Sequence, residues 1–178
     1  DSGLDAGTVQ GWHKADSAFS SPSGPTPYGG GSVAGYSFGG SGGSVAHFDK
    51  IAFSNDAITN ISPALPSPTN RQNATGGRSS THGYIMGGMI MPAVSYTNQV
   101  AKFPFTSPEA VSVLTGTLFD SKTSAHSEFI GPSDHDYTYM AGGVIGPPGF
   151  HNNVIQKFAT ASDTDNATDV GDLLQAIS

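Results

Sequence analysis

Two short apolar segments recur as a pair three times along the chain, separated by long polar stretches. The first carries a tyrosine three residues before a Gly-Gly pair, at residues 35–40, 83–88 and 138–143, and the second carries a lysine among apolar residues, at 48–53, 100–105 and 155–160. The tyrosines are 48 and 55 residues apart (84−36, 139−84), and the lysines are 52 and 55 apart (102−50, 157−102). A self-similar period of this size is typical of propellers and solenoids. We therefore predict one repeat domain over 1–178, with repeats at approximately 9–65, 70–114 and 123–174.

Each repeat is predicted to form four short antiparallel strands. The tyrosine segment alternates, with Tyr84 and Met86 on one face and Ile85 on the other, which predicts a half-buried strand that the glycines end in a turn. The lysine segment has apolar residues on both faces, as expected where sheets stack on both sides. The third strand is expected at the aliphatic runs 61–65, 111–114 and 170–174. The fourth is expected at 125–130, with counterparts near 11–19 and 70–75.

Residues 167–177 are the best candidate for a helix. Apolar residues recur there at helical spacing: Val170, Leu173, Leu174 and Ile177. The alignment of the repeats instead places a strand in this segment. We expect the strand.

The composition favours an all-β chain with many turns. Only 12% of residues are charged and 36% are hydrophobic, while 24 Gly and 12 Pro supply turns and ten Phe and six Tyr supply a core. The net charge is −7, and three of the five lysines belong to the repeats, so no basic patch remains for nucleic acid. No apolar run approaches the length of a membrane span. The absence of cysteine excludes disulfides, thiolate metal sites and a cysteine nucleophile. Because the chain starts at Asp1, we expect a processed protein or a piece of a longer one.

The aromatic residue before Gly-Gly, followed ten to fourteen residues later by an apolar strand, resembles kelch-type β-propeller blades. Phe48-Asp49 matches the aromatic-Asp pair of that family once. Aliphatic residues stand where the family has its strand-three tryptophan. Arg78–His82 keeps the family's arginine and histidine, with the histidine one position late. The resemblance implies kelch-like blades of four strands.

A second resemblance is to repeats common in proteins predicted from marine bacteriophage genomes. The segments that carry it are 79–84, 155–158 and 166–173. The resemblance implies a structural or adhesive component of a virion, such as a tail fibre, located on the particle or at an extracellular surface. Its implied partners are other structural subunits and a host-surface glycan.

Three repeats are too few to close a propeller, which has about four to eight blades. Open sheet edges are also surfaces that natural proteins avoid exposing. We therefore expect an incomplete ring, which either belongs to a longer propeller or is completed by other copies in a symmetric oligomer.

The motif lysines Lys50, Lys102 and Lys157 have two interpretations. They could form a ring of ammonium groups that binds an anionic glycan, or they could be strand residues that pair with an acid of the neighbouring repeat. A residue repeated in every unit usually serves the unit itself, so we expect the second.

Metal sites are weakly indicated. Asp163, Asp165 and Asp169 alternate as in a calcium loop, but the pattern lacks a ligand at its fifth position and glycine at its sixth, so we expect an acidic turn. Residues 134–136 form a second acidic loop tip. The six histidines show no helical metal spacing: His13, His47, His82, His126, His135 and His151. We expect His82 and His126 to be structural hydrogen-bonding residues.

Catalytic signals are equally weak. The chain has no G-x-S-x-G elbow, and without cysteine it cannot build the Cys–Tyr cross-link of kelch-type copper-radical sugar oxidases. We expect no catalytic, cofactor-binding or metal-binding residues, no cofactor and no enzymatic activity. Two alternatives stay open: a propeller lyase or hydrolase, and a glycan- or receptor-binding module. In the second, loop residues would stack on sugars: Tyr28, Tyr96, Phe150 and His151.

Overall fold

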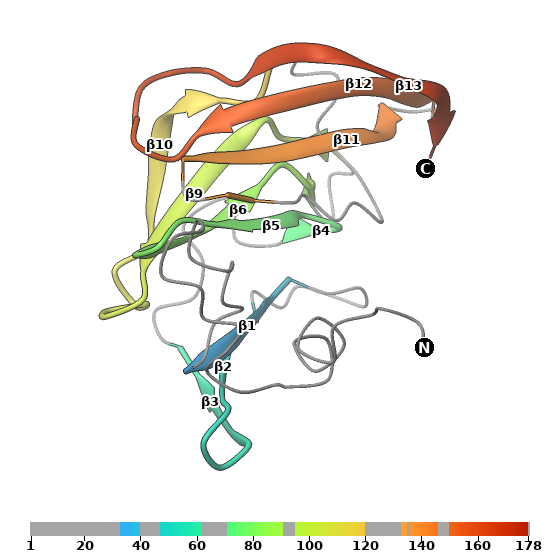
Figure 1. Cartoon of the computed structure of the whole chain (residues 1–178). Coiled ribbons are helices and arrows are strands. Elements are labelled where there is room, and N and C mark those ends of the chain that lie inside the picture. The colour runs from blue at the N-terminus through green and yellow to red at the C-terminus, as the bar shows by residue number, and fades with distance from the viewer. Residues whose placement is uncertain are drawn as a thin grey trace, which may run out of the picture. The chain divides into compact units, whose positions relative to one another are not determined.

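The computed structural model describes most of the chain from residue 33 onward. The described residues are 33–39, 47–61, 71–90, 95–119, 133–134, 136–145 and 150–177. The chain divides into two units, Asp1–Val33 and Ala34–Ser178, and all the described strands belong to the second. Every regular element among the described residues is a β-strand (Figure 1). The predicted all-β class is confirmed.

The described residues form thirteen strands in four antiparallel sheets. In chain order they are β1 (Ala34–Phe38), β2 (Phe48–Ala52), β3 (Ala57–Asn60), β4 (Arg71–Gln72), β5 (Thr75–Arg78), β6 (His82–Met86), β7 (Met89–Ile90), β8 (Ser95–Tyr96), β9 (Gln99–Pro104), β10 (Ser112–Thr117), β11 (Tyr137–Ile145), β12 (Phe150–Ala159) and β13 (Thr168–Ile177). We call β1-β2-β3 the first sheet, β10-β9-β6-β5 the second sheet, β11-β12-β13 the third sheet and β4-β7-β8 the small sheet. Over the described residues, none of the four closes on itself.

The two sequence motifs pair directly across neighbouring strands in the first, second and third sheets. Each motif tyrosine is the Cα partner of the motif lysine of its own repeat: Tyr36 with Lys50, Tyr84 with Lys102, and Tyr139 with Lys157. The sequence repeat is therefore a structural repeat with one strand register.

The Gly-Gly pair bends a strand that continues. β11 runs through Gly142 and Gly143, and β7 begins directly after Gly88. Gly87, Gly88, Gly142 and Gly143 have φ angles of 62°, 104°, 74° and 105°, which glycine adopts without steric cost. The prediction that the glycines end the strand in a turn is therefore wrong for the third sheet and incomplete for the second.

A β-bulge accompanies the bend in both sheets. In the second, the pairs Met86–Val100 and Met89–Tyr96 are three residues apart on one strand and four on the other. In the third, the pairs Ala141–Ile155 and Gly143–Asn152 are two and three residues apart. In both hairpins the extra residue lies on the strand that pairs with the Gly-Gly strand, and it changes the direction of the hairpin at the same point.

The small sheet continues the second sheet past this bend. Thr75 pairs with Met86, and three residues further along each strand Gln72 pairs with Met89, so the register is unchanged. Asn73, with a φ of 55°, separates β4 from β5. The strand predicted at 70–75 is thus two short strands that run to Arg78.

The third strands agree with prediction in two repeats. β10 covers the predicted run 111–114 in large part, and β13 contains 170–174, which confirms a strand there in place of a helix. In the first repeat the third strand of the sheet is β3, which follows a tight turn at Phe53–Asp56 and ends at Asn60, before the predicted run 61–65. Of that run only Ile61 is described, and it is not in a strand. The fourth strands predicted at 11–19 and 125–130 lie outside the described residues.

Strand alternation gives the second sheet two apolar faces. We call the face that carries a sheet's motif tyrosine and lysine its front face, and the opposite face its back face. On the front, Tyr84, Met86 and Val100 form one core cluster with Met140 and Phe158 of the third sheet.

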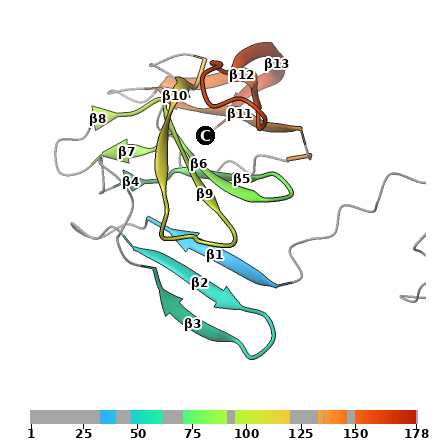
Figure 2. The same ribbon diagram turned by 90° about the vertical axis from the view of Figure 1, so that its left-hand side faces the viewer.

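The back face of the second sheet contacts the first sheet. Ile85, Ala101 and Phe103 form a separate cluster with Phe48 and Ile61. The second sheet therefore lies between the other two (Figures 1 and 2). In both interfaces the front face of one sheet packs on the back face of the next.

Candidate functional site

The two sheet–sheet interfaces share an aromatic contact. The ring centroids of Tyr36 and Phe103 are 5.0 Å apart at 60°, and those of Tyr84 and Phe158 are 5.9 Å apart at 60°. Each phenylalanine directly follows the motif lysine of its own sheet, so the two contacts join equivalent positions. Such pairs contribute about 0.5–1.5 kcal/mol beyond the area that they bury. The structure thus uses one packing rule twice.

The Tyr84 hydroxyl adds a buried polar contact to the second interface. It donates a hydrogen bond to the carbonyl oxygen of Thr160 at 2.8 Å, from the connection between β12 and β13. Burial raises the pKa of Tyr84, so its hydroxyl is protonated and available as a donor at neutral pH.

The same connection supplies an acid to the motif lysine of the second sheet. Lys102 Nζ lies 2.6 Å from Asp163 Oδ1. The predicted pairing with an acid of the neighbouring repeat is therefore confirmed at Lys102. Because the two side chains are 19% and 57% exposed, solvent screening limits the pair to about 1 kcal/mol or less.

The other two motif lysines lie in different surroundings. Lys157 Nζ is 3.6 Å from the centre of the Tyr137 ring, a cation–π contact. Lys50 is half-buried on the front face of the first sheet. The three motif lysines therefore have three different local environments: Lys102 beside a carboxylate, Lys157 over an aromatic ring and Lys50 half-buried on a sheet face.

Residues 160–167, which we call the clamp loop, cover the outer edge of the second sheet. The Asp163 carbonyl accepts bonds from the backbone N–H groups of Thr115 and Gly116, and the Ala167 N–H donates to Thr117 O at 2.7 Å. Asn166 Oδ1 accepts bonds from the N–H and hydroxyl of Thr117. Residues 115–117 of the edge strand β10 thereby find hydrogen-bond partners in the next repeat.

The acids that resemble a calcium loop belong to this loop and to the strand that follows it. Asp163 contacts Lys102, whereas Asp169 Oδ1 accepts a bond from its own turn, from Gly171 N at 3.0 Å. Asp165 contributes its backbone, which lies against Gly116. In the part of the chain that the structure describes, no group of three His, Asp or Glu residues is placed to hold a metal ion.

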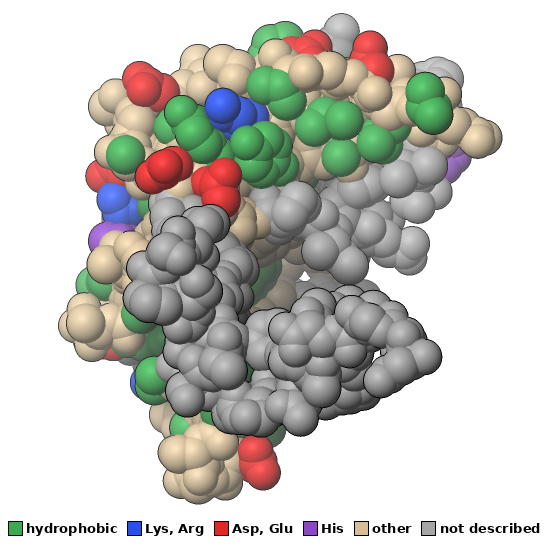
Figure 3. All heavy atoms as spheres, in the orientation of Figure 1, with side chains coloured by type: hydrophobic (Ala, Val, Ile, Leu, Met, Phe, Trp, Pro, Cys, Tyr) green, Lys and Arg blue, Asp and Glu red, His purple; other side chains and the backbone are tan. Residues whose placement is uncertain are grey.

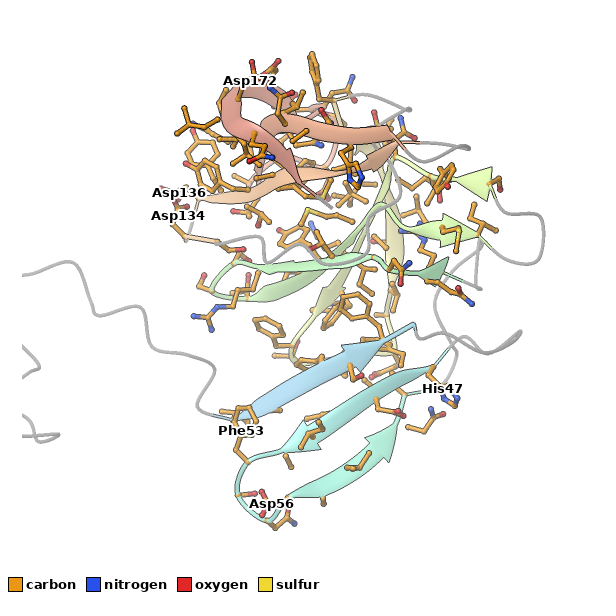
Figure 4. The ribbon with its side chains drawn as sticks, turned by 90° about the vertical axis from the view of Figure 1, so that its right-hand side faces the viewer. His47, Phe53, Asp56, Asp134, Asp136 and Asp172 are labelled. Atoms are coloured by element: carbon orange, nitrogen blue, oxygen red, sulfur yellow. The ribbon has the colours of Figure 1, made fainter. Side chains whose placement is uncertain are left out.

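The second acidic loop tip is a turn that leads into β11. Asp134 Oδ1 accepts hydrogen bonds from the backbone N–H groups of Asp136, at 2.8 Å, and Tyr137. Figure 4 shows Asp134 and Asp136 beside each other at the start of this strand. The Asp134 side chain therefore caps a turn. His135 lies outside the described residues.

The histidines are dispersed. His82 Nδ1 is 2.8 Å from Thr81 Oγ1, which confirms its predicted hydrogen-bonding role. Burial, and then the charge of Lys102, lower the pKa of His82. His47 and His151 are exposed, and His47 lies at one end of the first sheet (Figure 4). The remaining three are outside the described residues: His13, His126 and His135.

Two of the proposed sugar-stacking residues occupy equivalent places. Tyr96 pairs with Met89 and His151 with Val144, each one residue past a Gly-Gly bend. Tyr28 and the side chain of Phe150 are outside the described residues.

Arg71 is a structural residue that sequence reasoning missed. Its side chain is 2% exposed and donates hydrogen bonds to the carbonyls of Gly87 (3.5 Å) and Gln99 (3.3 Å) and to Gln99 Oε1 (2.9 Å). Burial lowers the pKa of Arg71 to about 10, so it stays charged at neutral pH. It ties β4 to the bend and to β9. The sequence predicts that Arg71 lies in a strand, but it carries no signal that the side chain is buried.

The strand β13 of the third sheet exposes apolar side chains. Val170, which lies two residues after the partner of Lys157 on the front face, is 49% exposed, and Leu174 further along the strand is fully exposed. Figure 3 shows hydrophobic side chains gathered over this sheet. In the first sheet, Ile58 of β3 is 71% exposed, and Phe53, in the turn that follows β2, is 51% exposed. Contiguous exposed apolar groups mark interaction surfaces.

Comparisons with known proteins add no assignment to this geometry. No described element is a helix long and apolar enough to cross a membrane. No protein-family model matches the chain, and no curated protein matches it significantly.

Proposed function

We propose that the chain is a non-enzymatic structural module of a virion, in a tail, fibre or other surface assembly. In this proposal its three main sheets are kelch-like propeller blades, and its work is to join subunits through sheet faces. Its partners are structural subunits, including further copies of the chain, and its location is the particle or an extracellular surface.

The observation that carries the proposal is the repeated front-to-back packing. The same tyrosine–phenylalanine contact joins the first sheet to the second and the second to the third. A contact that already joins two successive pairs of sheets can join a third pair, provided that a further sheet is present. The front of the third sheet, where Val170 is 49% exposed, is the surface on which a further sheet would pack.

The virion part of the proposal is supported by the resemblance of the repeats to those of bacteriophage proteins. Low charge and abundant Gly, Ser and Pro in the polar stretches suit a durable extracellular assembly.

The test is quantitative mass spectrometry of density-purified virus particles from the source of the sequence. We expect peptides of this chain at a fixed ratio to the major structural proteins, and retained after protease-free washing. A non-structural protein encoded by the same genome is the matched control and should wash away. Recovery of the chain only in the soluble host fraction would contradict the proposal.

A further inference from the structure

We propose that the front face of the third sheet docks the back face of the first sheet of a second copy of this chain, with Lys157 of one copy paired to Asp56 of the other. This inference rests on the proposed function and deepens it, because it names the two surfaces and the pair of charges that join them.

Burial at one repeated position identifies the docking face. Ile61, Leu114 and Val170 each lie two residues after the strand residue that pairs with the motif lysine. Ile61 and Leu114 are 7% exposed and belong to the core clusters formed with the next sheet, whereas Val170 is 49% exposed. The third sheet thus has the apolar residue that the other two use for docking, and no described sheet packs on it.

The charges point to a second copy as the occupant. Asp163, which pairs with Lys102 of the preceding sheet, comes six residues after the motif lysine of its own sheet (163−157). Asp56 stands at the same spacing in the first sheet (56−50), and Figure 4 shows it at the tip of the turn between β2 and β3. A first sheet docked by the observed rule therefore brings Asp56 to Lys157, as Asp163 is brought to Lys102.

The back face of the first sheet also offers apolar groups in the required place. Ile51 directly follows its motif lysine, in the position of Phe103 and Phe158, and it pairs across the sheet with Ile58, which is 71% exposed. Docking would place this pair against Tyr139 and Val170, much as Phe158 lies against Tyr84. Asp49 stands on the same face, and its carboxylate already accepts a bond from Asn60.

The association is heterologous, because the two faces differ. Each copy presents one front face and one back face, so copies join head to tail and form rings or filaments according to the rotation between them.

Zero-length carbodiimide cross-linking of mixed isotope-labelled and unlabelled chains tests the contact directly. We expect a Lys157–Asp56 cross-link in peptides of mixed isotope composition, which only two copies can give. The Lys102–Asp163 pair is the internal positive control, and its cross-link should join peptides of one isotope composition. The control cross-link alone, with a monomeric mass by light scattering over a wide concentration range, would overturn the inference.

Variants separate the docking contact from folding. Lys157→Gln and Asp56→Asn should each weaken self-association several-fold. Because each substitution removes the same ion pair, the double variant should associate no more weakly than the single variant with the lower affinity. Asparagine is chosen at position 56 because it tolerates the positive φ of Asp56 (54°). A third variant, Val170→Asp, should abolish association while leaving the unfolding midpoint unchanged. The matched control Glu109→Gln, an exposed acid outside both faces, should associate like the unmodified chain.

Failure here is distinguishable from failure of the proposed function. A monomeric chain that is nevertheless recovered from particles would overturn the docking inference and leave the structural role in place. A self-associating chain that is absent from particles would overturn the structural role in the virion and leave the docking inference in place.

Discussion

Replacing Phe103 with alanine is expected to lower the free energy of unfolding by about 3–5 kcal/mol, the range for a large aromatic residue deleted from a core. Phe103 is 2% exposed and packs at 4.8 Å from Phe48, 5.0 Å from Tyr36 and 6.0 Å from Phe105, measured between ring centroids. The cavity would lie between the first and second sheets. Because Gly83 leaves the space that the Phe103 ring occupies, the neighbouring strand has no side chain there to fill it.

Urea unfolding followed by circular dichroism measures this loss. Phe119→Ala is the matched control, since Phe119 is 50% exposed and its truncation should change the unfolding free energy by less than about 1 kcal/mol. Equal losses in the two variants would show that the first and second sheets do not share a packed core.

Replacing Gly116 with alanine should cost about 1–3 kcal/mol, the usual range for overpacking a well-packed site. A Cβ at this position would collide with the backbone carbonyl of Asp165 in the clamp loop. Backbone cannot move aside as the end of a side chain can, so the loop must withdraw from β10. The hydrogen bonds from Thr115 and Gly116 to Asp163 would then be strained or lost.

Amide hydrogen exchange reports this change locally. Protection should fall at Thr115, residue 116 and Ala167, with less change at the buried strand β6. Thr115→Ala is the control, because that side chain is exposed and the backbone bond of residue 115 is retained. Unchanged protection at Ala167 in the Gly116→Ala variant would mean that the loop does not hold the edge of β10.

The strand register and one charge pair were within reach of the sequence. The tyrosine and lysine motifs mark neighbouring strands because both keep the alternation of a sheet that is covered on two faces, and they prove to be direct partners. The repeat also selected a strand over a helix at 168–177, although the local spacing allowed either. Repetition of Lys102 pointed to a structural partner, and Asp163 is that partner.

Other features depend on contacts that no local pattern records. The Gly-Gly pair predicts the end of a strand, but the strand continues. Glycines with positive φ occur in turns and in bulges alike, so the pair alone does not distinguish the two. The acids near residue 165 resembled a cation loop, while the contacts that matter are backbone bonds to a strand almost fifty residues earlier (163−115). The burial of Arg71 arises from the bend at Gly87 and from Gln99, which come together only in the folded sheets.

Two double-mutant cycles test the central claim most directly, namely that one front-to-back contact is used at both interfaces. Tyr36→Leu with Phe103→Leu, and separately Tyr84→Leu with Phe158→Leu, would be measured by chemical unfolding. The account predicts a favourable coupling energy of about 0.5–1.5 kcal/mol in each cycle, with the same sign. A coupling energy near zero in either cycle would contradict it, because that pair would then not join its two sheets.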